Sequence, residues 1–159
     1  MHKLIQSIIV CGVMVLGVTT AKASDAKGYP GTFCQSNSSA AQLSGEAIVN
    51  TSSGTTQIKC GMIRDGSSIN QVKVFVKDLN ATNDVGCYVS SRVPKTDAAG
   101  AWGEWTPWSY TEGSSSYDKV LTFGSLSGWD YGYYGLTCNL PGVFSSNQSS
   151  LGAYWVREN

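Results

Sequence analysis

Short apolar stretches separated by turn residues are the feature of this sequence that most constrains its fold. Within these stretches apolar and polar side chains tend to alternate, as they do along half-buried β-strands, and no long helical periodicity competes with this pattern. The stretches are Ala47 to Asn50, Gln57 to Met62, Val72 to Lys77, Val85 to Ser91, Trp102 to Tyr110, Lys119 to Phe123, Tyr131 to Leu140 and Leu151 to Arg157. We therefore predict an all-β protein, an antiparallel β-sandwich of about eight strands with a jelly-roll or immunoglobulin-like arrangement.

The first 23 residues have the composition of a signal peptide. Lys3 precedes an apolar stretch over residues 4–18, and residues 21–23 (A-K-A) provide the small residues of a cleavage site. The apolar stretch is shorter than the roughly 20 residues that span a bilayer. We expect cleavage after Ala23, a secreted or periplasmic location, and no membrane insertion of the mature chain.

The remaining chain divides into two parts by composition. Residues 24–45 are rich in Gly, Ser and Asn and lack periodicity, which predicts an irregular N-terminal arm, and residues 46–159 form the predicted sandwich domain. Loss of Lys3 and Lys22 with the signal leaves nine basic and eleven acidic residues, a net charge of −2. No basic patch indicates a nucleic acid as partner.

Four cysteines remain after the signal, namely Cys34, Cys60, Cys87 and Cys138. An even number in an exported chain predicts two disulfides, for which three connectivities are open. Strand alternation puts the last three on apolar faces, whereas Cys34 lies in the polar arm. This favours Cys34–Cys60 as a tether of the arm and Cys87–Cys138 as a bridge across the core, with Cα separations of about 4.4–6.8 Å.

The sequence offers little for catalysis. Its single histidine, His2, leaves with the signal, which excludes histidine-activated nucleophiles and histidine metal ligands in the mature chain. Carboxylate pairs such as Glu104 with Glu112, or Asp118 with Asp130, lie in no catalytic motif. We expect no enzyme activity, no cofactor and no metal.

The loop over residues 78–84 has oxygen-bearing side chains at alternate positions. Such a loop could wrap calcium, but it has no bidentate Glu at the required distance and no central Gly. Asn and Asp also form turns through their own side chains. We favour the turn.

Aromatic residues are the candidate binding residues. Tryptophans at positions 102, 105 and 108 do not follow the strand period of two, so Trp102 and Trp108 are predicted on one face and Trp105 on the other. Packing in the core and an exposed platform for sugar rings are both open interpretations. The candidate ligand-binding residues are Trp102, Trp105, Trp108, Tyr110, Tyr131 and Tyr133.

Several short motifs resemble a family of exported bacterial disulfide-bonded β-sandwich proteins that is itself uncharacterised. The resemblance implies the fold and the compartment and supplies no activity. Gly61 stands where that family usually has a proline. The motifs are Val49 to Ser52, Ile58 to Asp65, Val72 to Asp78, Val85 to Cys87, Leu136 to Pro141 and Ser150 to Glu158.

Two functions remain as hypotheses. The first is a non-catalytic binding module for carbohydrate or a cell-surface glycan, which would use the exposed aromatic residues. The second is a structural or protein-interaction protein of the envelope or extracellular space, with a cell-surface protein as partner.

Overall fold

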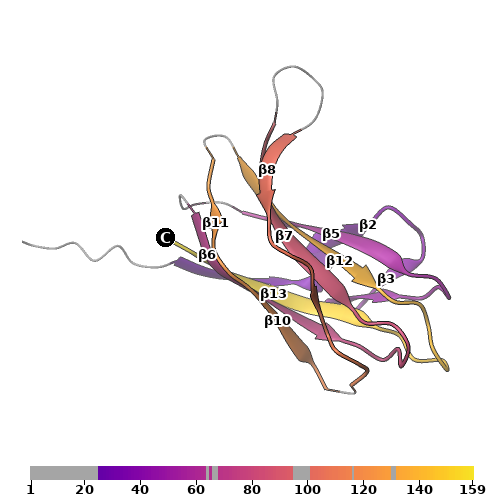
Figure 1. Cartoon of the computed structure of the whole chain (residues 1–159). Coiled ribbons are helices and arrows are strands. Elements are labelled where there is room, and N and C mark those ends of the chain that lie inside the picture. Colours follow the sequence, from indigo (N-terminus) through magenta and orange to yellow (C-terminus); the bar gives the residue numbers. More distant parts are fainter. Residues whose placement is uncertain (1–24, 64, 66–67, 95–100, 116, 130–131) are drawn as a thin grey trace, which may run out of the picture.

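The computed structural model of this chain describes residues 25–63, 65, 68–94, 101–115, 117–129 and 132–159, and within these residues it is almost entirely β-structure (Figure 1). No helix in this part of the chain is long and apolar enough to cross a membrane. The elements are β1 (Asp25–Pro30), the 3₁₀ turn η1 (Gly31–Phe33), β2 (Cys34–Ser36), β3 (Ala41–Ser44), β4 (Ala47–Asn50), β5 (Thr56–Met62), β6 (Ser68–Lys77), β7 (Gly86–Pro94), β8 (Ala101–Trp105), β9 (Ser109–Tyr110), β10 (Lys119–Phe123), β11 (Leu126–Ser127), β12 (Tyr133–Leu140) and β13 (Ser150–Glu158).

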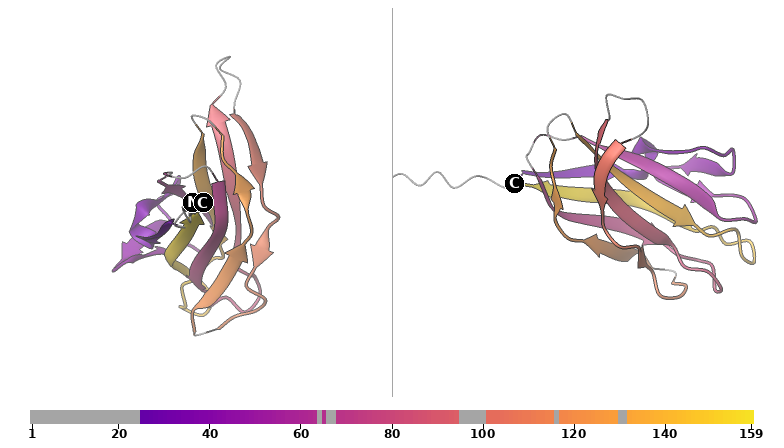
Figure 2. Two further views of the ribbon diagram at one scale, coloured as in Figure 1. Left: turned by 90° about the vertical axis from the view of Figure 1, so that its left-hand side faces the viewer. Right: turned by 45° about the horizontal axis from the view of Figure 1, so that its top comes forward.

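The strands form two antiparallel sheets that face each other, which confirms the predicted sandwich (Figure 2). Sheet A has the order β10-β6-β13-β4-β3, with β1 paired to β13 and β11 paired to β6. Sheet B has the order β2-β5-β12-β7-β8, with β9 paired to β7. Each central strand therefore has a face toward the other sheet and a face toward solvent.

The core lies between the two sheets and follows from strand alternation. Along β5 the residues Ile58, Cys60 and Met62 are buried, while the residues between them face outward. Val72, Val74 and Val76 do the same along β6 from the opposite sheet. The two inner faces remove these apolar side chains from water, which is the main favourable contribution to folding.

All eight predicted stretches coincide with strands, but the structure has thirteen strands among the described residues. The stretch from Trp102 to Tyr110 divides into β8 and β9, and β11 is additional. The predicted irregular arm is wrong for its described residues, 25–45, which contain β1, β2 and β3. These strands lie at sheet edges and are mostly exposed, so backbone pairing rather than an apolar pattern defines them.

The turn between β3 and β4 explains how the supposed arm joins the sheet. Ser44 pairs with Ala47, which leaves a two-residue loop whose first residue, Gly45, has a φ of 62°. Two-residue hairpin loops favour a glycine at a first position with positive φ. Gly45 thus folds β3 back on β4 as a hairpin.

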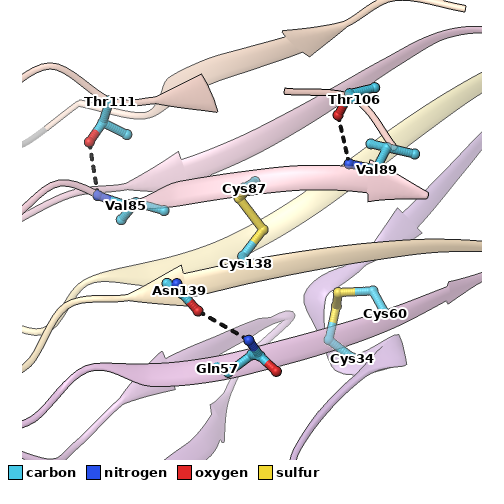
Figure 3. Close-up of a disulfide and its surroundings, with 10 residues drawn as sticks. All are labelled: Cys34, Gln57, Cys60, Val85, Cys87, Val89, Thr106, Thr111, Cys138 and Asn139. Atoms are coloured by element: carbon cyan, nitrogen blue, oxygen red, sulfur yellow. Dashed lines mark hydrogen bonds between the residues drawn. A yellow bond between two sulfur atoms is a disulfide. The ribbon is translucent and has the colours of Figure 1, made fainter. Parts of the chain in front are cut away.

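Both predicted disulfide pairings are confirmed (Figure 3). Cys34 pairs with Cys60 directly across β2 and β5, and Cys87 pairs with Cys138 directly across β7 and β12. The prediction that the second bridge crosses the core is therefore wrong, because both bridges join neighbouring strands of sheet B. The Cα separations, 4.1 Å in each bridge, are slightly shorter than the predicted range.

Two tyrosines of sheet A connect it to the end of β5 in sheet B. The buried Tyr154 hydroxyl donates to the Gly61 carbonyl at 2.5 Å, and the Tyr29 hydroxyl accepts from the Ile63 backbone N–H at 3.2 Å. The two rings stack with centroids 5.0 Å apart. Burial raises the pKa of both hydroxyls above the ordinary value of tyrosine.

A lysine holds the paired ends of β1 and β13 together. The Lys27 ammonium lies 3.1 Å from Asp25, 2.6 Å from Asp65 and 3.3 Å from the buried Glu158. Burial alone would lower the pKa of Lys27, but the hydrogen bonds to Asp65, Asp25 and Glu158 outweigh it and raise that pKa.

Candidate functional site

An extra residue between β8 and β9 decides which way the tryptophans face. Both strands pair with β7, where Trp105 lies opposite Ser90 and Ser109 lies opposite Cys87. Three residues, 106 to 108, therefore stand against the two residues Tyr88 and Val89, which is the arrangement of a β-bulge. The Thr106 side chain takes part in the pairing, because its hydroxyl accepts from the Val89 backbone N–H at 3.0 Å (Figure 3).

The bulge reverses the alternation between Trp105 and Trp108. Trp105 lies opposite Ser90, on the outer face of sheet B, and Trp108 contacts Tyr88 on that same face with ring centroids 4.7 Å apart. Trp102 lies opposite Val93 and so takes the other face of β8. The predicted pairing of Trp102 with Trp108 on one face is thus wrong, because the strand does not run unbroken through Pro107.

None of the three tryptophans belongs to the core. Their exposed fractions are 65% for Trp102, 54% for Trp105 and 39% for Trp108, so the interpretation as core residues is wrong. Tyr110, 55% exposed, stacks on Trp108 with centroids 6.2 Å apart. A Cβ built on Gly86 would lie 2.6 Å from the Tyr110 ring, so the glycine makes room for it.

Trp105 and Tyr133 lie on either side of Arg92 on this outer face. The Arg92 guanidinium lies 5.6 Å from the centroid of the Trp105 ring, a cation–π distance, and Tyr133 lies directly opposite Arg92 in the neighbouring strand. Tyr133 is 46% exposed, which agrees with its predicted place on the outer face of its strand, the face that does not carry Cys138. Tyr131 lies outside the described residues.

A groove lies on the same face, on the β5 side of these exposed aromatic residues. Its floor is a row of small residues in register across three strands, namely Gly61 in β5, Gly135 in β12 and Ser90 in β7. Its volume is about 730 Å³. We call it the sheet-B groove, and the described residues that line it are Phe33, Gln35, Ser36, Asn37, Gln57, Lys59, Cys60, Gly61, Tyr88, Ser90, Arg92, Tyr133, Tyr134, Gly135, Leu136 and Thr137.

The floor of the groove is open because its residues lack large side chains. A Cβ built on Gly61 would meet no atom within 4 Å, and one on Gly135 would lie in ordinary contact with the Ser90 hydroxyl at 3.4 Å and the Cys60 carbonyl oxygen at 4.0 Å. Sequence reasoning missed these residues along with Lys59 and Tyr88. Period-two alternation already puts all of them opposite to the core cysteines, but only the cross-strand register brings them into one row.

A second groove lies on the outer face of sheet A. It has a volume of about 510 Å³ and is lined by Gly28, Tyr29, Pro30, Glu46, Lys73, Phe75, Ala153, Tyr154 and Trp155. The Lys73 ammonium lies 5.7 Å from the centroid of the Trp155 ring. This sheet-A groove is mainly apolar, whereas the sheet-B groove has amide, hydroxyl and cationic side chains.

The loop after β6 confirms the turn that the sequence favoured. Asp78, fully buried, accepts from the backbone N–H groups of Asn80 at 3.1 Å and Val85 at 3.0 Å, and Asn80 accepts from the Thr82 N–H at 2.9 Å. These oxygens are therefore engaged in shaping the chain. Among the described residues no three His, Cys, Asp or Glu side chains are grouped to hold a metal ion.

Comparisons with known proteins find no matching family model and no matching curated protein. Among solved structures, the chain is similar to the CBM36-1 domain of a multidomain xylanase from the hindgut metagenome of Trinervitermes trinervoides, with a TM-score of 0.49 and 8% identity over 85% of this chain and 98% of that one. It is also similar to the low-affinity xylan-binding module CBM86 of Roseburia intestinalis, with a TM-score of 0.47 and 14% identity over 83% and 94%. A family 6 carbohydrate-binding module gives a TM-score of 0.44 and 13% identity over 80% and 90%. Identities this low assign no ligand to this chain.

Proposed function

We propose that this protein is a non-catalytic binding module that recognises a glycan on the outer face of sheet B. One observation carries the proposal: exposed aromatic rings share that face with an open groove whose floor is made of two glycines and a serine. Most of the residues that line the groove belong to paired strands of sheet B, so their backbone positions are fixed without a ligand.

The chemistry of the face suits sugar rings. The apolar face of a pyranose stacks on indole and phenol rings, and its hydroxyls need hydrogen-bond partners around the edge. Trp105 and Tyr133 provide rings near one side of the groove, and Trp108 stacked with Tyr110 provides a second aromatic surface. Gln57, whose amide donates to Asn139 at 3.5 Å, is among the polar groups beside them.

The two disulfides suit a protein that acts outside the cytoplasm, where free glycans and cell surfaces occur. Two disulfides are typical of proteins that mature in an oxidising environment. We propose that the chain is exported, with the N-terminal 23 residues as its signal, and that it acts outside the cytoplasm.

The proposal is tested by native affinity electrophoresis against a panel of neutral and acidic polysaccharides, with isothermal titration for any that bind. Trp105→Ala and Trp108→Ala should each weaken binding by roughly two- to tenfold, because an aromatic contact contributes about 0.5–1.5 kcal/mol beyond area burial. Trp102→Ala is the matched control, since Trp102 is more exposed than either but lies on the other face of β8.

Filling the groove gives an independent test. Gly61→Leu puts a side chain where no atom lies within 4 Å of the new Cβ, and should abolish binding without disturbing the fold. Gly28→Leu is its control, because Gly28 is also an open strand glycine but lies in sheet A. Retained binding in Gly61→Leu, or loss in Gly28→Leu alone, would contradict the assignment to sheet B.

A second candidate function is protein recognition through the sheet-A groove, which its apolar lining of Pro30, Phe75, Ala153 and Trp155 favours. Trp155→Ala should then reduce capture of a protein from the native secretome while Trp108→Ala leaves it unchanged. The opposite pattern would assign the interaction to sheet B.

A further inference from the structure

The sheet-B groove carries positive charge that the described residues do not neutralise. Resting on the proposed function, we propose that its ligand is an acidic glycan, one that carries carboxylate or sulfate groups along its chain.

Every charged residue that lines the groove is a cation. Lys59 in β5 and Arg92 in β7 both belong to the lining, and it contains no Asp or Glu. The cross-strand partners of these two residues are Gln35 and Thr137 for Lys59, and Tyr133 and Gly103 for Arg92. The charge of the described groove lining is therefore of one sign, and it attracts anions.

Neither cation has an ion-pair partner within the described part of the chain. Arg92 contacts the Trp105 ring, and its Nε is buried without a hydrogen-bond partner there. Lys27 on sheet A differs sharply, because three carboxylates surround its ammonium. Among the described residues, therefore, the lysine at the end of β1 has carboxylate partners, whereas the two groove cations have none.

The two cations lie on opposite sides of the glycine floor. Lys59 in β5 is in register with Thr137 in β12 and with Tyr88 in β7, so it lies two strand spacings from β7. Arg92 lies in β7, four residues after Tyr88. Strand geometry puts their Cα atoms about 16 Å apart. The Arg92 guanidinium lies near Trp105 in β8, on the side of β7 away from Lys59. Successive acidic sugars of a polymer can contact both cations, whereas one small anion contacts only one.

Aromatic residues between cations would also suit single-stranded nucleic acid, in which bases stack and phosphates pair with Lys or Arg. Two cations are few for that purpose, because nucleic-acid sites follow the backbone with many positive charges. A glycan with charge on some of its sugars matches the combination of rings, amides and two separate cations better. Binding of a single-stranded oligonucleotide is measured as the competing case.

The central comparison is between two forms of one polymer, with and without its negative charge. Polygalacturonate is paired with its fully methyl-esterified form, alginate and chondroitin sulfate extend the acidic set, and dextran and xylan extend the neutral set, with a single-stranded oligonucleotide alongside. Binding is measured at about 50 mM and about 500 mM salt, which screens exposed charges weakly and strongly. We expect binding to an acidic glycan that exceeds binding to its uncharged counterpart and falls with salt.

Charge variants locate the effect. Lys59→Gln and Arg92→Gln should each weaken binding to the acidic glycan by about three- to tenfold, since hydrogen bonds to charged groups contribute more than neutral ones. Arg92→Lys should recover part of the loss because it keeps the charge. Lys73→Gln is the control, because Lys73 lies on the outer face of sheet A beside Trp155 and should leave this binding unchanged.

The outcomes separate the two proposals. Equal binding to charged and uncharged forms, or binding to neutral glycans alone, would overturn the acidic ligand and leave the proposed function standing. Equal or tighter binding to the oligonucleotide would overturn it in favour of nucleic acid. An effect of Lys73→Gln without an effect of Lys59→Gln or Arg92→Gln would overturn the site. Absence of binding to every glycan would overturn the proposed function itself.

Discussion

Removal of the Cys87–Cys138 bridge tests whether the disulfides stabilise the whole domain or only part of it. The bridge spans 51 residues, and the chain-entropy relation for a loop of this length gives about 4 kcal/mol at 25 °C. The unfolding free energy of a domain is about 5–15 kcal/mol, so the double variant Cys87→Ala/Cys138→Ala should lose a large share of it. Both strands are central in sheet B, so neither can separate while the rest stays folded.

The Cys34–Cys60 bridge should behave differently although its loop is only somewhat shorter. Its separation of 26 residues corresponds to about 3.5 kcal/mol by the same relation. However, β2 pairs through only three residues and lies at the edge of sheet B. When this bridge is absent β2 can detach alone, so the loss of global stability is limited to the free energy that holds β2 in place.

Urea unfolding, followed by tryptophan fluorescence and far-UV circular dichroism, measures both effects. The unfolding free energy of a small domain falls by about 2 kcal/mol per molar urea, so the urea midpoint of Cys87→Ala/Cys138→Ala should fall by about 2 M. The midpoint of Cys34→Ala/Cys60→Ala should fall less, while hydrogen exchange increases in β2. An equal or larger shift for the second variant would refute this distinction between a central and an edge bridge.

Three further outcomes follow from described contacts. Gly86→Ala should displace the Tyr110 ring, because its Cβ would lie 2.6 Å away; we expect a loss of about 1–3 kcal/mol in urea unfolding, together with weaker glycan binding. Lys27→Met removes the ammonium that contacts Glu158 and should cost about 2 kcal/mol at pH 7, which calorimetry would show as a lower Tm; no change would contradict a stabilising role. Burial raises the pKa of the Tyr154 hydroxyl in the folded protein. Below about pH 10 the hydroxyl is neutral in both the folded and the unfolded state, so Tyr154 contributes fully to stability; above pH 10 the unfolded state loses this proton first, and that contribution declines. Tyr154→Phe should therefore show a shallower loss of stability between pH 10 and 12 in unfolding titrations, and an unchanged slope would contradict it.

Strand alternation predicted the central strands because their inner residues are apolar over several positions. Val72, Val74 and Val76 in β6 are such a case. Alternation also predicted the disulfide pairing, since it put Cys60, Cys87 and Cys138 on inner faces. It failed for β1 and β3, where few side chains are buried and the backbone of the neighbouring strand defines the pairing.

The candidate site was only partly predictable for a physical reason. The exposure of Tyr133 follows from alternation along β12, because Tyr133 and Cys138 are an odd number of residues apart. The face of Trp108 depends on the extra residue of the β-bulge between β8 and β9, and simple alternation does not predict a bulge. The groove floor joins Gly61, Gly135 and Ser90 from three strands, and a row of this kind appears only once the register between strands is known.

The position of both disulfides in one sheet has a consequence for which side chains the outer face of sheet B presents. A slip of one residue between antiparallel strands would turn every outward side chain inward. The covalent pairs Cys34–Cys60 and Cys87–Cys138 join directly opposed residues and so forbid such a slip between β2 and β5 and between β7 and β12. Sheet A has no such restraint among its described strands. The outward pattern of side chains that forms the sheet-B groove is therefore covalently fixed at these two strand pairs.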